Sequence, residues 1–361
     1  PKCPEFHANL GIILKDRRKL IEAEVSARKA LELNPNIAQF HANLGMVLKD
    51  LGKLEEAKLS IIKEIELKPG SAYSYSNLGS ILRDLGELND AEIEARKAIK
   101  LKPDYSLAHL NLGTILKDLG KLKEAEKSIR KAIKLNSLSA ESHCNLGAIL
   151  KDLGKLKEAE ESTKKAIDIK SDFADAYSNL GSILIDLGKL KEAELSLLKA
   201  IKLNSNLSIA YFNLSTLKYS INYETWKNKL FSKEILNNKA SKDKIDIYFA
   251  RSNILHNEKN FEGSSENLIV ANQLKLLLKP SNADFLINKS NALLIESEQQ
   301  IIINNKSSNA YGNIFIVGMP RSGSTLIESI LSTNKIVKDL GEVNYLEESF
   351  LEFNKSHEKS N

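Results

Sequence analysis

The residues best suited to chemistry lie near the C-terminal end of the printed sequence. The chain there reads Asn313-Ile-Phe-Ile-Val-Gly-Met-Pro-Arg-Ser-Gly-Ser-Thr-Leu-Ile-Glu-Ser-Ile-Leu331. Four consecutive apolar residues, Ile314 to Val317, predict a buried parallel strand, and the apolar spacing after Thr325 predicts a helix. A glycine loop between a strand and a helix directs free amide N–H groups and the positive helix end at one point. This segment therefore predicts a site for a phosphate-bearing ligand.

The composition of the loop narrows the choice of ligand. Gly318 and Gly323 have the spacing of a Walker loop, but Ser324-Thr325 follows where that loop has lysine and a hydroxyl residue. The lysine that would reach a γ-phosphate is missing. Arg321 lies inside the loop instead, where a guanidinium can bind an anion through two hydrogen bonds. A glycine turn without a ligand and a nucleotide-hydrolysing loop are the alternatives.

The loop resembles a known family. Pro320-Arg321-Ser322-Gly323-Ser324-Thr325 looks like the 5′-phosphosulfate-binding loop of sulfotransferases that use 3′-phosphoadenosine 5′-phosphosulfate. It is most similar to the tyrosylprotein sulfotransferase branch and to bacterial proteins that place tetratricopeptide repeats ahead of it. The resemblance implies this cosubstrate and no metal. It assigns cosubstrate binding to Pro320, Arg321, Ser322, Gly323, Ser324 and Thr325.

The same resemblance suggests catalytic residues. Glu342 follows Arg321 by 21 residues, close to where the tyrosylprotein branch has a glutamate that takes the proton of the acceptor hydroxyl. Glu342 is therefore the candidate general base, and an ordinary surface glutamate is the alternative. Arg321 would stabilise charge on the leaving phosphate. Asn334-Lys335 replaces the His-Pro that the family usually has, and the segment for the 3′-phosphate is expected beyond the chain.

The elements ahead of the loop follow a strict repeat. Asn-Leu-Gly recurs every 34 residues from Asn9 onward, and a seventh copy reads Asn213-Leu214-Ser215. The surrounding pattern predicts a helix, a short turn and a second helix, and it resembles the tetratricopeptide repeat. Glycine inside the first helix would let the second helix approach, and a glycine after Asp-Leu would form a left-handed C-terminal cap. The predicted fold is mainly α, a right-handed solenoid followed by the start of an α/β P-loop-like sulfotransferase domain.

The domain organisation follows from where the repeat weakens. Residues 4–207 are expected to form six repeats, and 208–304 to form degenerate repeats and linking helices, with one worn repeat at 245–278 and a helix at 283–304. Residues 304–313 are polar and rich in turn formers, so they mark a boundary. Residues 313–361 then begin the sulfotransferase domain. Because the chain opens inside a repeat and few residues follow the loop, we expect a fragment truncated at both ends.

The asparagine column predicts a binding surface. Asparagine is a mediocre helix former, yet it fills the same position in every copy. The pattern resembles the asparagine ladder of O-GlcNAc transferase, and side-chain amides both donate and accept hydrogen bonds, which suits sequence-tolerant peptide binding. Asparagine that bonds only to neighbouring repeats is the alternative. The predicted peptide-binding residues are Asn9, Asn43, Asn77, Asn111, Asn145, Asn179 and Asn213.

Composition restricts the partners. The formal net charge of +5 is spread through mixed-sign blocks, which argues against a nucleic-acid partner. Cys3 and Cys144 are the two cysteines, too far apart in sequence to suggest a disulfide framework or a metal site, so a reducing, cytoplasmic location is expected. No apolar run is long enough for a membrane helix. Two functions are left open, a sulfotransferase that recruits a polypeptide or other large acceptor, and a protein-interaction scaffold without catalysis.

Overall fold

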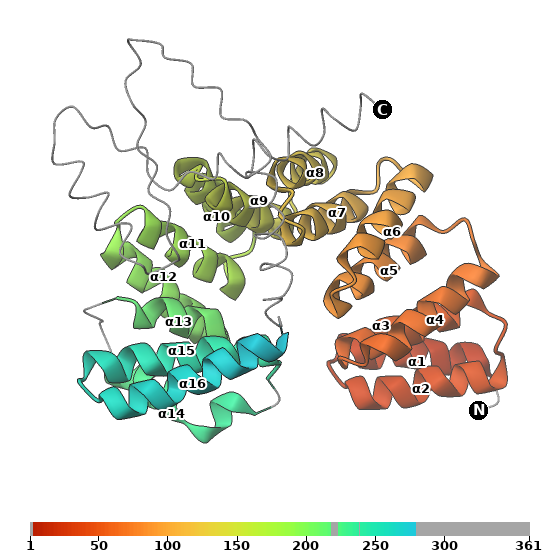
Figure 1. The fold of residues 1–361 in the computed structure, drawn as a ribbon. Helices are drawn as coiled ribbons and strands as arrows, with labels where there is room; N and C mark the ends of the chain where they lie inside the picture. The colour runs from red at the N-terminus through yellow and green to blue at the C-terminus, as the bar shows by residue number, and fades with distance from the viewer. Residues whose placement is uncertain (1–2, 218–222, 238, 279–361) are drawn as a thin grey trace, which may run out of the picture. The chain divides into compact units, whose positions relative to one another are not determined.

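The computed structural model describes residues 3–217, 223–237 and 239–278. The described helices belong to one compact unit (Figure 1). The expected strand, loop and helix of 313–361 lie outside the described residues, as do Glu342 and the helix expected at 283–304.

Six helix pairs follow one another along the first part of the chain, each with a first helix of 13 or 14 residues and a second helix of 14. Each second helix packs against the first helix of the next pair (Figure 1). The pairs are α1 (Pro4–Asp16) with α2 (Leu20–Leu33), α3 (Ala38–Asp50) with α4 (Leu54–Leu67), α5 (Ala72–Leu85) with α6 (Leu88–Leu101), α7 (Ser106–Asp118) with α8 (Leu122–Leu135), α9 (Ala140–Asp152) with α10 (Leu156–Ile169), and α11 (Ala174–Asp186) with α12 (Leu190–Leu203).

The turn inside each pair depends on a left-handed residue. Gly120 has φ of 76°, and the equivalent glycines of the neighbouring pairs also have positive φ, which confirms the predicted C-terminal cap. In the first pair Arg18 takes this conformation with φ of 61°, without the freedom of glycine. The backbone N–H of Lys121, just after the glycine, donates to the carbonyl of Leu116 at 2.8 Å and closes the helix end.

The glycine inside the first helix sets how closely the two helices of a pair approach. A Cβ added at Gly113 would lie 2.5 Å from Cγ1 and Cδ1 of Ile129 on α8, and one at Gly147 would lie 2.0 Å from Oγ1 of Thr163 on α10. Ile129 and Thr163 are fully buried. The predicted packing role of this column is therefore confirmed, because a larger residue would overlap the second helix.

The apolar core runs continuously through the stack. It is built from leucines and isoleucines of the first helices, such as Leu112 and Ile115, and from alanines of the second helices, such as Ala125. The core joins residues from the first pair to the sixth, so each pair buries its apolar face only against its neighbours.

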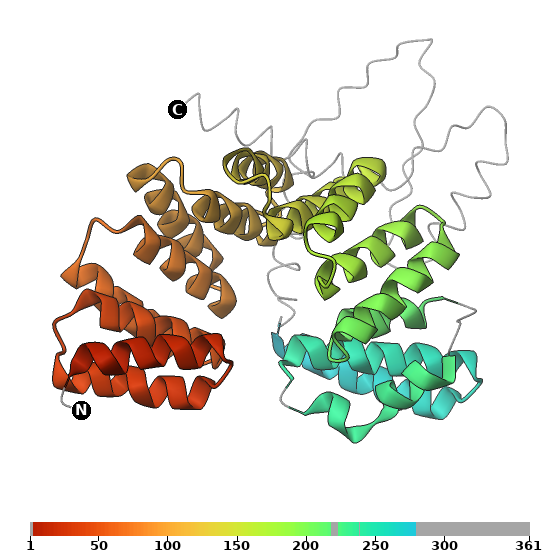
Figure 2. The same cartoon turned by 180° about the vertical axis from the view of Figure 1, so that it is seen from behind.

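The first helices lie closer together than the second helices. Each first helix from α1 to α11 contacts the first helix of the next pair, whereas no second helix among the described residues contacts the next second helix to a comparable extent. The side of the stack that carries the first helices is therefore its inner, more tightly spaced side. Figure 1 and Figure 2 show the helix pairs of the stack from opposite sides.

After residue 207 the regular pairing changes. Helix α13 (Ser208–Ser215) keeps the start of a first helix, but α14 (Tyr223–Phe231) and a 3-10 turn, η1 (Lys233–Leu236), replace a regular second helix. Helix α15 (Ser241–Asn257) packs directly on α13 and pairs with α16 (Phe261–Leu278). Trp226 is buried in the core shared by these segments.

The α15–α16 pair has the small-residue contact expected of a worn repeat. The hydroxyls of Ser252 and Ser264 lie 3.0 Å apart, and the Ser264 hydroxyl also lies 3.0 Å from the Ser252 carbonyl. Two small polar residues thus meet where glycine and alanine meet in the regular pairs. The residue with positive φ in the turn is Lys259.

A buried carboxyl replaces a buried alanine in one of the second helices. Glu64 on α4 occupies the position that is alanine in every other regular pair, and those alanines are fully buried. The Ser74 hydroxyl donates to Oε1 of Glu64 at 2.6 Å, while Oε2 is buried and accepts no hydrogen bond from the described residues. Burial raises the pKa of Glu64, against smaller opposing effects of Ser74, Lys68 and His41.

We predict that Gly113→Ala destabilises the chain although alanine is the better helix former. Overlap with buried Ile129 should lower the free energy of unfolding by about 1–3 kcal/mol. Gly11→Ala is the matched control, because its added Cβ would meet atoms no nearer than 3.4 Å and should gain up to about 1 kcal/mol from helix propensity. Urea unfolding followed by circular dichroism measures both. Equal effects at the two positions would contradict the packing role.

We predict that Glu64→Ala is more stabilising at neutral pH than at pH 4.5, because it removes a buried carboxyl whose Oε2 accepts no hydrogen bond from the described residues. Loss of the hydrogen bond from Ser74, worth about 0.5–1.5 kcal/mol, offsets part of the gain at both pH values. The folded-state pKa lies above the unfolded one, so the native protein loses stability as pH rises from about 4.5 through the folded-state pKa. The gain should therefore shrink as pH falls toward 4.5 and below. Exposed Glu66→Ala is the control and should change unfolding little at either pH. A gain that does not depend on pH would contradict this account.

Candidate binding groove

The asparagine column lies on the inner side of the stack. Each asparagine of the column sits on a first helix, from Asn9 on α1 to Asn213 on α13. On each first helix, the residues four before, three after and seven after the asparagine share its face, because they are about one or two helical turns away. We call the residues at these four positions on α3, α5, α7, α9 and α11 the asparagine stripe. In the third pair they are Tyr73, Asn77, Ser80 and Asp84.

Three asparagines donate hydrogen bonds to the preceding pair. The side-chain Nδ2 of Asn111 donates to the hydroxyl of Ser76 at 2.9 Å and to its carbonyl at 3.3 Å. The Nδ2 of Asn145 donates to Oγ1 of Thr114 at 3.4 Å, and that of Asn179 to the thiol sulfur of Cys144 at 3.2 Å. These bonds connect successive first helices and fix the orientation of each amide.

These hydrogen bonds do not use every donor and acceptor of the asparagine side chains. An asparagine side chain offers two donor hydrogens and an acceptor oxygen. The Oδ1 atoms of Asn111, Asn145 and Asn179 accept no hydrogen bond from the described residues, and all three side chains are half-buried. Asn43 differs, since its Oδ1 accepts from Gln39 at 2.9 Å. One side-chain amide can therefore donate to the preceding pair through Nδ2 and at the same time accept a hydrogen bond from a bound ligand through Oδ1.

An ion-pair ladder borders the asparagines. A basic residue near the end of each first helix from α1 to α9 reaches the aspartate of the next first helix, so that these charges are paired. The distances range from 2.8 to 3.6 Å, and the pairs are Lys15–Asp50, Lys49–Asp84, Arg83–Asp118, Lys117–Asp152 and Lys151–Asp186.

The histidines that precede the asparagines have structural partners. The ring Nε2 of His109 lies 3.0 Å from the carbonyl of Pro103, and the carbonyl of His109 accepts from the Ser128 hydroxyl at 2.9 Å. His41 and His143 make the same contacts one or two pairs away. These histidines thus hold the loop and the second helix of their own pair.

The second helices carry a separate charge network on the other side of the stack. Arg96 on α6 pairs with Glu92 at 2.8 Å and with Glu124 on the next second helix at 3.0 Å. Hydrogen bonds from Lys121 and then from Arg96 hold the pKa of Glu92 below its usual value, although burial opposes them. The network fixes the spacing of the second helices.

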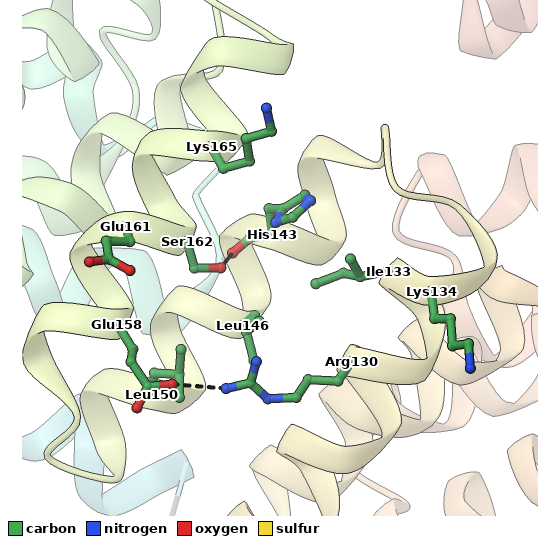
Figure 3. A pocket seen from close by; sticks show the side chains of 10 residues that line it. All are labelled: Arg130, Ile133, Lys134, His143, Leu146, Leu150, Glu158, Glu161, Ser162 and Lys165. Atoms are coloured by element: carbon green, nitrogen blue, oxygen red, sulfur yellow. Dashed lines mark hydrogen bonds and ion pairs between the residues drawn. The ribbon is translucent and has the colours of Figure 1, made fainter.

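A crevice of about 460 Å³ lies between α8 and α10, over α9 (Figure 3). Arg130 crosses it to reach Glu158 at 3.0 Å, and the Ser162 hydroxyl donates to the His143 carbonyl at 2.9 Å. Both contacts recur one pair earlier, as Arg96 with Glu124 and Ser128 with His109. We assign this crevice to packing between pairs, because these polar contacts follow the repeat.

The cysteines and acidic side chains of the described residues show no reactive or metal-binding arrangement. Burial raises the pKa of the Cys144 thiol to about 12, so it stays protonated, and Cys3 and Cys144 are both free thiols. Within the described ranges, no group of three or more histidine, cysteine or acidic side chains could hold a metal ion. No helix of that part is long and apolar enough to cross a membrane. The inner side offers amides, hydroxyls and paired charges, which suit a polypeptide backbone.

The predicted cosubstrate residues, from Pro320 to Thr325, and Glu342 lie outside the described residues. Sequence reasoning missed two features of the inner side. One is a contact between Tyr73 and Tyr105, and the other is a pair of acidic residues, Glu141 and Asp175. Both depart from the repeat, so a comparison of the residue four before each asparagine would have found Tyr73, Glu141 and Asp175.

Comparison with protein families supports the two parts of the chain separately. The tetratricopeptide repeat family matches residues 72–105, 107–137, 140–173 and 174–207, and a second tetratricopeptide repeat model matches 27–58. The chain thus contains tetratricopeptide repeats. The sulfotransferase family model matches residues 313–361.

Solved structures share the fold of the repeat array. The chain is similar to the anaphase-promoting complex assembly Cut9–Hcn1, with 17% identity and a TM-score of 0.56 over 59% of this chain and 42% of that one. It is also similar to PilW, a type IV pilus biogenesis factor, with 20% identity and a TM-score of 0.50 over 55% and 92%. No curated protein sequence matches the chain. These likenesses establish a helical repeat solenoid.

We predict that Asn111→Ala lowers the stability of the chain more than Asn77→Ala does. Asn111 bonds to Ser76, so its loss should lower the free energy of unfolding by about 1 kcal/mol. Asn77 makes no side-chain hydrogen bond among the described residues, so its loss should change stability by less than about 0.5 kcal/mol. Urea midpoints measure the difference. Equal losses at both positions would contradict the assignment of the Asn111–Ser76 hydrogen bond as the stabilising contact.

Proposed function

We propose that the protein is a sulfotransferase whose repeat array holds a polypeptide or other large acceptor for transfer of a sulfuryl group. The observation that carries the proposal is the match of residues 313–361 to the sulfotransferase family, in the same chain as tetratricopeptide repeats that match up to residue 207. The free thiols of Cys3 and Cys144 agree with a reducing, cytoplasmic location.

The loop residues supply the chemistry in this proposal. The amides and hydroxyls of Ser322 to Thr325 would bind the 5′-phosphosulfate, with the Pro320 turn holding the loop. Arg321 would stabilise the charge that grows on the phosphate as the sulfuryl group leaves. Glu342 would take the proton of the acceptor hydroxyl. Cosubstrate and acceptor would thus be bound by different parts of one chain.

The inner side of the array supports a polypeptide acceptor. Its asparagine amides have unused acceptor oxygens and recur at a regular spacing, so they can bind a backbone independently of its sequence. The paired lysines and aspartates beside them add little net charge. Recruitment by such a groove would lower the KM of a long acceptor and leave the chemical step unchanged.

A protein-interaction scaffold without catalysis is the second candidate. The tetratricopeptide repeats favour it, because the inner side of the array carries amides with unused acceptor oxygens that a partner polypeptide could bind. The two candidates make different demands on the loop, since a scaffold has no need of Arg321.

We predict that the full-length protein binds 3′-phosphoadenosine 5′-phosphate, the product of transfer, and that Arg321→Ala weakens binding. Loss of a charged hydrogen-bonded contact should cost about 1.5–3 kcal/mol, or about 10- to 150-fold in Kd. Isothermal titration calorimetry with and without EDTA measures the affinity and its metal dependence. EDTA should have no effect.

Arg28→Ala is the matched control, because Arg28 lies on the exposed side of α2 and should not touch the nucleotide. Equal affinity of Arg321→Ala and the unchanged protein would contradict the proposed role of the loop. Preference for ATP with magnesium would favour a nucleotide-hydrolysing loop instead.

A further inference from the structure

The asparagine stripe changes its chemistry along the array. The residue four before the asparagine is Tyr73 in the third pair and Leu107 in the fourth, and both side chains are exposed. In the fifth and sixth pairs the same position holds Glu141 and Asp175, which are also exposed. One face therefore runs from apolar to acidic over four consecutive first helices.

The apolar end is a rigid aromatic platform. The rings of Tyr73 and Tyr105 lie 4.7 Å apart between centroids, and the Lys102 ammonium donates to the Tyr73 hydroxyl at 3.0 Å and lies 5.1 Å from its ring centre. Tyr73 is nevertheless 53% exposed. A ring held in place by neighbours and left open to solvent offers apolar area at a low entropic cost.

This platform connects directly to the asparagines. Burial raises the pKa of Tyr105, and the nearby Ser76 side chain lowers it by a smaller amount, so the Tyr105 ring lies beside Ser76. Ser76 in turn accepts from Asn111 at 2.9 Å. A backbone bound at Asn111 would therefore pass beside the aromatic rings, where one of its side chains could pack against Tyr73.

The acidic end has charges without partners. Among the described residues, Glu141 and Asp175 form no ion pair or hydrogen bond through their side chains. Both lie near Cys144, the acceptor of the Asn179 hydrogen bond, because both contribute after burial to the raised pKa of that thiol. The nearby Lys117 is already paired with Asp152 at 3.6 Å. Two net negative charges thus border the groove at Asn145 and Asn179.

We propose that the stripe of the third to sixth pairs binds an extended polypeptide segment with an aromatic side chain at Tyr73 and, about six to nine residues away, a lysine or arginine at Glu141 and Asp175. Neighbouring helices are about 8–10 Å apart and an extended chain advances about 3.3 Å per residue, so one pair spans about three residues, two pairs about six and three pairs about nine. The inference rests on the polypeptide groove of the proposed function and specifies which segments it selects.

Fluorescence anisotropy with the full-length protein and labelled Gly/Ser peptides tests this. The first peptide carries one phenylalanine and two arginines, one about six and one about nine residues further. The second has glutamates in place of the arginines, and the third has the arginines next to the phenylalanine. The first should bind about two- to five-fold more tightly than either of the others. Its advantage over the second should fall as salt is raised, because exposed charges are screened.

Protein variants locate the effect. Glu141→Gln with Asp175→Asn should remove the advantage of the arginine peptide, and Tyr73→Ala should weaken the first peptide about fivefold or more. The charge-matched control is Glu161→Gln with Asp168→Asn on α10, which alters two exposed acids of a second helix and should leave binding unchanged. Circular dichroism of each variant confirms folding.

The outcomes separate this inference from the proposed function. Equal binding of the three peptides would overturn the inference and keep a sequence-tolerant groove. Absence of binding by every peptide would overturn the groove itself and the inference with it. Nucleotide calorimetry is independent of both, so a protein that selects the first peptide but binds no nucleotide would keep the inference and reject the sulfotransferase.

Discussion

The close contact between the two helices of each pair is the constraint on which the rest of the structure depends. Glycine at positions such as Gly113 brings the second helix within reach, and the buried side chain opposite, Ile129, leaves no space for a larger residue. A left-handed glycine such as Gly120 then fixes the turn. Because this geometry recurs every 34 residues, the next pair always meets the same surface, and every asparagine of the column reaches the same side.

Because the helix pairs are regularly spaced, the inner side of the stack carries two kinds of side chain at fixed positions. Asn111 and Asn145 hold the neighbouring first helix and keep an acceptor free, so they add both stability and binding capacity. In the fifth and sixth pairs the residues four positions earlier, Glu141 and Asp175, have no partners among the described residues. Function can therefore vary there at little cost in stability, whereas a larger residue at Gly113 would overlap the second helix.

Features that repeat could be predicted from the sequence, and features that depart from the repeat could not. The helix pairs, the left-handed caps and the glycine packing follow from local propensity and period. The direct packing of α15 on α13 depends on contacts between residues far apart in sequence. The Tyr73–Tyr105 contact also joins two neighbouring pairs and has no counterpart elsewhere in the column. Glu64 is visible as an exception in an alanine column, but its buried oxygen is known only from coordinates. The cosubstrate residues at 320–325 remain a sequence prediction.

The most direct test of the account measures transfer of a radiolabelled sulfuryl group by the full-length protein to two acceptors, a polypeptide and a small phenol. The variant is Asn77→Ala with Asn111→Ala and Asn145→Ala. If the groove recruits the acceptor, the variant should raise the KM of the polypeptide, leave its kcat unchanged and leave the phenol unaffected. Transfer to neither acceptor by the unchanged protein, or equal loss with both acceptors in a folded variant, would contradict the account.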